Sequence, residues 1–469
     1  MSRLPAVRRP DLLRLPLLGA LLRWRRGRLV FQLALLLVAL LIIYDGLTGP
    51  QIAPENIATV AAWLQYRGLV VLALLFAGNL FCMGCPFTLP RTLARRLSDR
   101  GRRWPRSLRN KWVAILFFFL LLFVYEWFDL WASPWLTAWV AVAYFAGAFL
   151  LEAIFRESPF CKYVCPLGTF NFAGSTISPL QITVHDRDVC RTCPGKECVN
   201  GSAQVLGCGT ELFPPQLASN IDCTFCLDCA RACPYENVAL APRSPLQELL
   251  RPDAWPRRWD WAMLALVFAF TALSNAFGMV PPFYELEAAL AGWLGREEPG
   301  LVLLLIFGTI DLLFPAGFGL GVAWLSRHLA GKREPLRHTF TRYAPAVMPL
   351  AFAIWLAHYG FHFATGALSI VPVTQNFLLD HGITVFGRPD WTLSALLPLS
   401  WLLPLEIGIT LVGLAGTLYL TGERAAHLEP EPDPLSAQLP WVLLFLAIAL
   451  AAIILFTLPM EMRGTGFMD

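Results

Sequence analysis

Charged residues are scarce in this chain of 469 residues, of which 15% are charged and 56% are hydrophobic. A soluble globular domain carries about 25% charged residues, so this composition excludes an ordinary water-soluble enzyme. Long apolar runs account for the difference and predict an all-α polytopic membrane protein. The net charge of +4 is small and no aromatic-basic motif stands out, so no nucleic-acid partner is expected.

Cysteine is missing from both ends of the chain, because all twelve cysteines lie between Cys82 and Cys233. An even count is also typical of a disulfide framework. Disulfides persist in oxidising compartments, whereas the charge pattern described next places these cysteines in the cytoplasm, so thiolate ligands are favoured. The sequence also shows no nucleophile–base pair and no phosphate-binding loop, which argues against hydrolysis and nucleotide chemistry.

Nine apolar segments, each about long enough for the roughly 30 Å hydrocarbon core, predict transmembrane helices. Basic residues in the N-terminal segment and after the second apolar run place both regions inside by the positive-inside rule. The nearly uncharged 48–67 and the acidic 282–298 are expected outside, and the basic loop 327–343 inside. The expected spans are 29–47, 68–81, 112–132, 136–155, 259–281, 299–326, 344–366, 395–421 and 439–459.

The strongest motif is C-x2-C-x2-C-x3-C-P, formed by Cys223, Cys226, Cys229, Cys233 and Pro234. This is the spacing of [4Fe-4S] ligands in bacterial ferredoxins, where the fourth cysteine serves a second cluster. A structural zinc site is the alternative, although zinc ribbons usually repeat C-x2-C pairs without the proline. The run therefore favours iron–sulfur chemistry.

A looser run, C-x2-C-x4-C-x9-C, precedes this motif. Crossing the ligands as two-cluster ferredoxins do predicts two [4Fe-4S] clusters. Cluster one is expected to take Cys190, Cys193, Cys198 and Cys233, and cluster two to take Cys208, Cys223, Cys226 and Cys229. A degenerate first run that binds one cluster or none remains the alternative.

The motifs and spans together predict a membrane protein of about nine transmembrane helices with an inserted bacterial dicluster ferredoxin-like module. Its expected parts are 1–28, a basic cytoplasmic N-terminus; 29–166, a four-helix membrane part; 167–258, a cytoplasmic 4Fe-4S domain; and 259–469, a five-helix membrane domain.

Two further cysteine pairs, Cys82/Cys85 and Cys161/Cys165, follow spans two and four, and each ends in Cys-Pro. If these spans are neighbours, four thiolates meet at one level of the membrane surface. Such a set could hold a third cluster or another metal. The alternative is that each pair is a reduced thiol pair or only caps the end of its helix.

Ionisable residues inside membrane spans are costly and commonly mark function. The second half of the chain contains four of them, Asp311, His358, His362 and Glu406, which are expected to form one polar site in the outer half of the bilayer. The site is open to three interpretations: a quinol and proton site, a metal or haem site, or structural pairing. Haem is disfavoured, because adjacent turns of one helix cannot supply both axial ligands and the other spans lack histidine.

Residues 29–255 resemble the membrane-bound 4Fe-4S polyferredoxins of the NapH/NosR/CcoG kind. The likeness rests on the paired spans, the two Cys-Pro pairs and the cysteine run ending at Cys233-Pro234. It implies a multi-pass protein of the bacterial inner membrane that carries electrons between the quinone pool or a cytoplasmic donor and a redox partner protein. The chain departs from this family in the C-x2-C-P spacing of its first pair and in its five-span extension.

The leading expectation is therefore an iron–sulfur electron-transfer protein, with membership of a quinol dehydrogenase-type complex left open. The alternative is a metal-handling or assembly factor, for copper or metal-centre maturation, that uses the cysteines and membrane histidines as ligands. A weaker option is a transporter whose five C-terminal spans carry substrate under redox control.

Overall fold

The computed structural model describes residues 10–90, 94, 102–155, 158–251, 257–295, 298–428 and 433–461. Residues 1–9 of the expected basic N-terminus, and residues 91–93 and 95–101 of the arginine-rich loop after residue 86, lie outside these ranges. The described part is mostly helical, and its one sheet has two strands.

The chain is a multi-pass membrane protein, because eight helical segments among the described residues are long and apolar enough to cross a bilayer. They are Gly27–Thr48 (α2), Ile57–Phe76 (α3, η3 and α4), Pro134–Ile154 (α8), Trp259–Phe277 (α13), Pro299–Leu329 (α15, η9 and α16), Leu336–Asp380 (α17 to α19), Leu399–Ala426 (α20 and part of η12) and Pro434–Thr457 (α21).

The third expected span is shorter than a full crossing. It forms α7 (Trp112–Trp127), which has 16 residues. The chain leaves the helix in a turn at Asp129, whose φ of 44° lies in the left-handed region. The sequence thus predicts nine spans where the structure has eight of full length and this short helix.

The second span lies closer to the N-terminus than expected, because Ile57–Phe76 replaces 68–81. It consists of α3 (Ile57–Thr59), the π-helical η3 (Val60–Gln65) and α4 (Tyr66–Phe76). Asn56 caps its start by accepting a hydrogen bond from the N–H of Ala58, and Gly78, with φ of 80°, follows its end. Much of the expected outside segment 48–67 is therefore helical, and Arg67 lies within a membrane helix.

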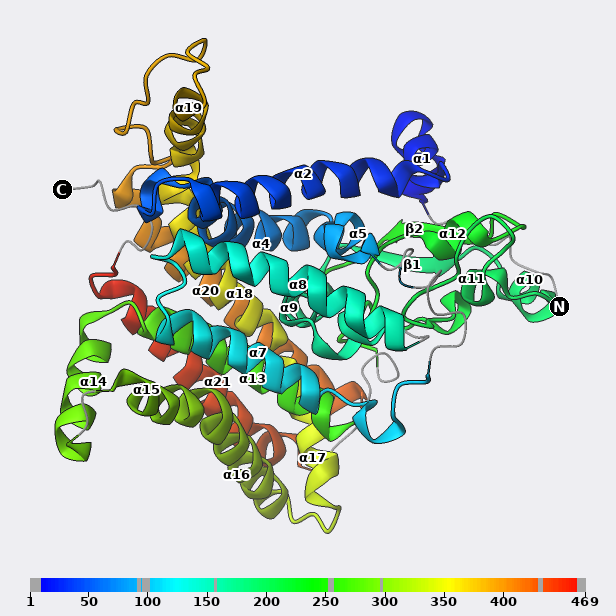
Figure 1. The fold of residues 1–469 in the computed structure, drawn as a ribbon. Coiled ribbons are helices and arrows are strands. Elements are labelled where there is room, and N and C mark those ends of the chain that lie inside the picture. Colours follow the sequence, from blue (N-terminus) through cyan, green and yellow to red (C-terminus); the bar gives the residue numbers. More distant parts are fainter. Residues whose placement is uncertain are drawn as a thin grey trace.

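Helices also occupy two of the expected loops. The acidic 282–298 contains α14 (Pro281–Leu294), and the basic 327–343 contains α17 (Leu336–Tyr343). Beyond α18 (Met348–Gly366), α19 (Ile370–Asp380) lengthens the seventh span. Figure 1 shows α14 and α19 at the end of the helix bundle opposite to the cysteine-rich segment.

The centre of the bundle is formed by α13 and α18, which are apolar on nearly all sides and almost fully buried. Helices of this kind belong in the interior of a larger assembly of helices. The indole N–H of Trp355 donates to the carbonyl of Phe268 at 2.9 Å, so even a polar atom between the two helices is satisfied. Helices α4, α7, α16, α20 and α21 surround this pair.

The cysteine-rich segment lies at one end of the bundle, with the N-terminal helix α1 (Pro16–Arg23) near it (Figure 1). Its strands β1 (Leu180–Val184) and β2 (Val238–Pro242) pair antiparallel, with Ile182 opposite Leu240. Leu13 and Leu22 from the N-terminal residues complete its hydrophobic cluster. Three short helices carry one cysteine each: α10 (Arg187–Thr192), α11 (Glu197–Asn200) and α12 (Asp228–Ala232).

Candidate metal centres

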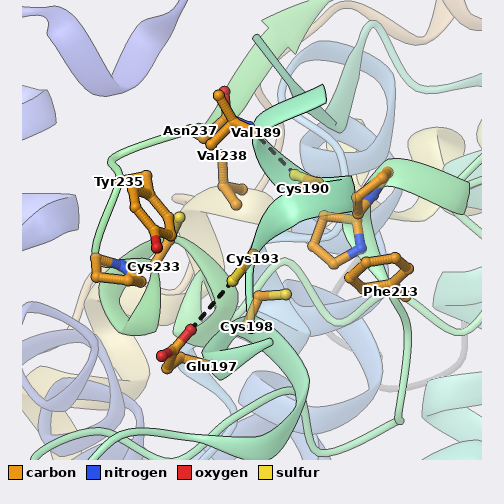
Figure 2. A pocket seen from close by; sticks show the side chains of 13 residues that line it. Val189, Cys190, Cys193, Glu197, Cys198, Phe213, Cys233, Tyr235, Asn237 and Val238 are labelled. Carbon is orange, nitrogen blue, oxygen red and sulfur yellow. Dashed lines mark hydrogen bonds between the residues drawn. The ribbon is translucent and has the colours of Figure 1, made fainter. Parts of the chain in front are cut away.

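Four cysteines far apart in the sequence surround a hollow of about 340 Å³, counting the space at its mouth. We call them set one: Cys190, Cys193, Cys198 and Cys233. Figure 2 shows their sulfur atoms around a common space between α10, α11 and the end of α12. The structure thus gathers the four residues expected to serve cluster one.

Two polar side chains touch the sulfur atoms of set one (Figure 2). The amide of Asn237 donates to Cys190 Sγ at 3.1 Å, and Cys193 Sγ lies 3.4 Å from a carboxylate oxygen of Glu197. Burial, with neighbouring thiolates, raises the pKa of Cys198 to about 11. A metal bound here would supply the positive charge that four clustered thiolates need.

Set two consists of Cys208, Cys223, Cys226 and Cys229, the residues expected for cluster two. They are close enough to interact: burial raises the pKa of Cys229 well above its usual range, and the charges of the other three add to the effect. Cys226 and Cys229 are buried. The cysteines thus lie together in space in the same two sets that the crossed ligand pattern predicts.

The backbone around set two is strained. Asp222, Phe225 and Leu227 all have positive φ, at 65°, 51° and 59°. Such conformations cost free energy in non-glycine residues and persist where the surrounding structure requires them. Three within six residues describe a loop wound tightly around a small volume, which fits a compact cluster held by its cysteines.

The two Cys-Pro pairs also meet. Set three, which comprises Cys82, Cys85, Cys161 and Cys165, lines a cavity of about 370 Å³ together with Phe81, Phe87, Phe160 and Thr224. Its cysteines come from α5 (Leu80–Gly84), η6 (Phe160–Val164) and the turns that precede Pro86 and Pro166. Burial raises the pKa of Cys85 to about 11 and that of Cys165 to about 12.

Sets two and three are neighbours. Thr224, from the turn between Cys223 and Cys226, lines the cavity of set three. The amide of Asn79, just before α5, donates to the carbonyl of Cys223 at 3.1 Å. Set one follows set two across the single turn of α12, which separates Cys229 from Cys233. The three sets therefore form a row that leads from the exposed part of the segment to the ends of the membrane helices.

Two cations lie along this row, the partly buried Arg28 and the buried Lys111, and their sequence positions indicated only topology. Arg28 donates to Asp228 at 3.1 Å and to the carbonyl of Met83 at 3.0 Å, and it interacts electrostatically with Cys226, Cys161 and Cys85. It therefore lies between sets two and three. A basic residue at the start of an apolar run was the only sequence signal for it.

Lys111, the second cation, is 2% exposed. Its ammonium group contacts Asp222 at 2.5 Å and the carbonyl of Lys162 at 2.5 Å. Asp222 directly precedes Cys223, and Lys162 directly follows Cys161. Burial lowers the pKa of Lys111, while Asp222 favours its charged form.

No group of three or more His, Cys, Asp or Glu side chains in the described ranges is arranged to hold a single metal ion. The thiols of sets one and three line hollows instead of converging on one point.

The four membrane residues expected to form one site are all buried, at 0% exposure for Asp311 and His358, 6% for His362 and 4% for Glu406. The His358 and His362 rings are 4.8 Å apart on one face of α18. Glu406 lies on α20, which packs along α18. Asp311 instead interacts with Ser274 of α13 and Glu126 of α7.

Sequence reasoning missed other buried charged residues of the membrane region, among them Arg67 on α4 and Glu126 on α7, which are 8% and 7% exposed. Arg67 was assigned to the outside segment 48–67 because the second span was placed too late, whereas Glu126 falls within the expected span 112–132 and was not singled out. Their positions near the ends of long apolar runs were the only available signal.

No family model, curated protein or solved structure matches the chain. The likeness to membrane polyferredoxins therefore rests on the motifs alone.

Proposed function

We propose that this chain is a membrane-bound iron–sulfur electron-transfer protein whose cysteine-rich segment is a ferredoxin-like module with two [4Fe-4S] clusters. The observation that carries the proposal is the crossed grouping of eight cysteines into sets one and two. A [4Fe-4S] cluster held by such sets supplies one-electron redox chemistry.

The shape of the sites supports clusters over single ions. A tetrahedral zinc ion draws four ligands to about 2.0–2.3 Å from one point. The thiols here line hollows of about 340 and 370 Å³ for sets one and three, and the loop of set two is strained around its own volume. Cysteines at the corners of a cube need this wider spacing.

The chain's own residues would control each centre. Asn237 donates a hydrogen bond to a sulfur of set one, which stabilises the added electron. Arg28 and Lys111 do the same for sets two and three by placing positive charge beside them. The hydrophobic cluster that includes Leu13, Phe225 and Leu227 excludes water from set two.

Set three extends the row to the membrane, and we propose that it holds a third centre. An electron that enters at set one could then leave near the ends of α5 and α9 (Pro166–Gly174). Quinone and a redox partner protein are the proposed exchange partners on the membrane side, and a quinol dehydrogenase-type complex is the proposed setting. The two histidines of α18 and Glu406 remain candidates for a quinol site.

The proposed location is a bacterial inner membrane, with the cysteine-rich segment in the cytoplasm. Helix α1, which ends at Arg23, lies at the end of the bundle that carries the cysteines, and Arg28 contacts Asp228 there. Helix α14, which carries Glu285 and Glu287, lies at the opposite end. This charge distribution agrees with the positive-inside rule.

Anaerobic purification with metal analysis and low-temperature EPR tests the proposal. We expect about eight irons per chain for two clusters and about twelve if set three is also filled. Cys226→Ala should remove the signal of one cluster, whereas the matched variant Thr224→Val, in the same turn, should keep it. A colourless protein, or one that binds stoichiometric zinc and no iron, would refute the relay; bound copper would favour the metal-handling alternative.

A further inference from the structure

A buried arginine lies in the membrane region among aromatic rings. The guanidinium of Arg67 donates to the hydroxyl of Tyr125 at 3.1 Å and lies 4.2 Å from the centroid of that ring. Trp63 and Tyr359 complete the cage, each about 5.1 Å away. Cation–π contacts of this kind stabilise a desolvated cation, but they do not cancel its charge.

One carboxylate, Glu126, lies near this arginine, and a second, Asp311, lies near Glu126. Glu126, the neighbour of Tyr125 on α7, interacts electrostatically with both Arg67 and Asp311. It also lies close to α13, because a Cβ at Gly278 would be 3.3 Å from one of its oxygens. Charged groups in the interior of a membrane protein are held in this way, paired and facing other helices.

Asp311 is the unbalanced member. It is 0% exposed, and neither carboxylate oxygen accepts a hydrogen bond at normal distance from the described residues, although the Ser274 hydroxyl is near. It lies in η9 (Thr309–Leu313), a π-helical segment in the middle of a membrane span. Such segments are rare and frequently occur at functional sites.

The formal charges of Arg67, Glu126 and Asp311 determine how many protons the three residues hold together. One guanidinium cation and two carboxylates carry a net charge of −1, and an uncompensated charge in a dry interior is far too costly to persist. We propose that Arg67, Glu126 and Asp311 form a proton-binding site inside the membrane, which holds one exchangeable proton and trades it with water on the side away from the cysteines.

The route to that side passes along α7. Asp129 follows Glu126 by one turn and is exposed, and its charge acts on Glu287 of α14. When the proton leaves, the O–H bond of the Asp311 carboxyl breaks, and Glu126 and then Asp129 accept the proton before water does. A proton from water restores the O–H bond and the charge balance by the reverse path.

Other titratable groups on the surrounding helices must be considered. Tyr125 and Tyr359 face Arg67, and His358 and His362 lie on α18, which packs against α13. Glu406 lies on α20, which packs along α18, and it is not among the groups that act on Asp311. Among the described residues, α15 and the membrane part of α21 carry no titratable side chain towards the site.

Infrared difference spectroscopy of the full chain in lipid nanodiscs tests this directly, with a pH step in H2O and in D2O. It reads the carbonyl stretch of protonated carboxyl groups and requires no electron transfer, so its result is independent of the iron–sulfur proposal. We expect a carboxyl band from this site that shifts on deuterium exchange. Asp311→Asn should remove it, because Glu126 is then balanced by Arg67. The control variant Asp45→Asn, at a buried carboxyl of α2 that accepts from the N–H of Ile57, should keep it.

Arg67 supplies a second, opposite test. Arg67→Gln leaves two carboxylates without a cation, so a second exchangeable carboxyl band should appear, while Arg67→Lys should retain one. Thermal unfolding of each variant checks that it is folded. A band that survives in Asp311→Asn, or one that never exchanges its proton in the wild type, would overturn the proposal and leave the cluster a static structural contact.

Discussion

An almost completely buried ion pair joins Arg243 to Glu248 outside the membrane spans. The two side chains are 1% and 0% exposed. Arg243 also donates to the carbonyls of Ser175 at 2.8 Å and Thr176 at 3.0 Å, and Glu248 accepts from the N–H of Asn220 at 2.8 Å. The pair thus fastens the chain after β2 to the base of the cysteine-rich segment.

Replacing Arg243 by methionine should strongly destabilise this region, because it leaves a buried carboxylate without its cation and removes the hydrogen bonds to the carbonyls of Ser175 and Thr176. Removal of one partner from a buried pair costs about 3–5 kcal/mol. This corresponds to a roughly hundred- to few-thousandfold rise in the population of the locally opened segment. Glu248→Gln should cost less, because the neutral amide can still accept hydrogen bonds and the arginine keeps its carbonyl partners.

Hydrogen exchange followed by mass spectrometry measures this effect, since local opening sets the exchange rate of amides in β2 and the residues after it. The matched control is Arg191→Met, which breaks the exposed pair with Asp188, where the side chains are 75% and 72% exposed. An exposed pair contributes about 0–1 kcal/mol at most. If these amides exchanged no faster in Arg243→Met than in this control, the ion pair would not stabilise the segment after β2.

Three further predictions follow from other contacts. Lys111→Met removes a buried cation beside sets two and three and should lower the reduction potential of the nearer cluster by about 50–100 mV. This shift follows from an interaction of about 2 kcal/mol for a unit charge at about 10 Å in an effective dielectric of about 20. Redox titration followed by EPR measures the potential, and an unchanged value would contradict the prediction. Burial raises the pKa of Glu334, but Thr339, Arg342 and Lys332 together bring this pKa below its usual value. The ionised carboxylate therefore stabilises the fold at neutral pH, and this stabilisation is lost as pH falls through the folded pKa. The melting temperature of Glu334→Gln should be below that of the wild type at pH 7 and equal to it in strong acid, and a difference that stays constant with pH would contradict this. Gly68→Ala would place a Cβ 2.3 Å from Phe363 and should destabilise the α4–α18 contact by about 1–3 kcal/mol, whereas Gly360→Ala, which meets nothing within 4 Å, should melt near the wild type.

The sequence predicts the features of this protein that depend on local pattern. Each apolar run became a helix, since hydrophobic length is enough to specify one in a membrane. The crossed grouping of cysteines was also predictable, because the spacing is that of two-cluster ferredoxins, in which the fourth cysteine of a run serves the other cluster. The meeting of Cys82 and Cys85 with Cys161 and Cys165 required only that two spans be neighbours.

Features that depend on the rotation and depth of a helix could not be predicted from the local sequence pattern. The second span was placed too late because Arg67 interrupts its apolar run, and only the aromatic cage from three helices makes that arginine acceptable. Asp311 was grouped with the histidines by depth alone, yet its side chain meets Ser274 and Glu126. Periodicity gives the height of a residue in a span, whereas packing decides which neighbour it faces.

The packing of the second half bears on what the five later helices do. One hydrophobic cluster includes Val71 and Leu74 of α4, Phe118 of α7, and Phe268 and Trp355 of α13 and α18. A boundary after residue 258 therefore divides the sequence but not the core. Because α13 and α18 also carry neighbours of the Arg67 site, the later helices are positioned to act on the same centre of the membrane that the first four reach. The proposed electron relay at one end of the bundle and the proposed proton site between its two halves would then share one hydrophobic core. Through this core, reduction of a cluster would change the proton affinity of the Asp311 site, and protonation of that site would change the reduction potential of the cluster.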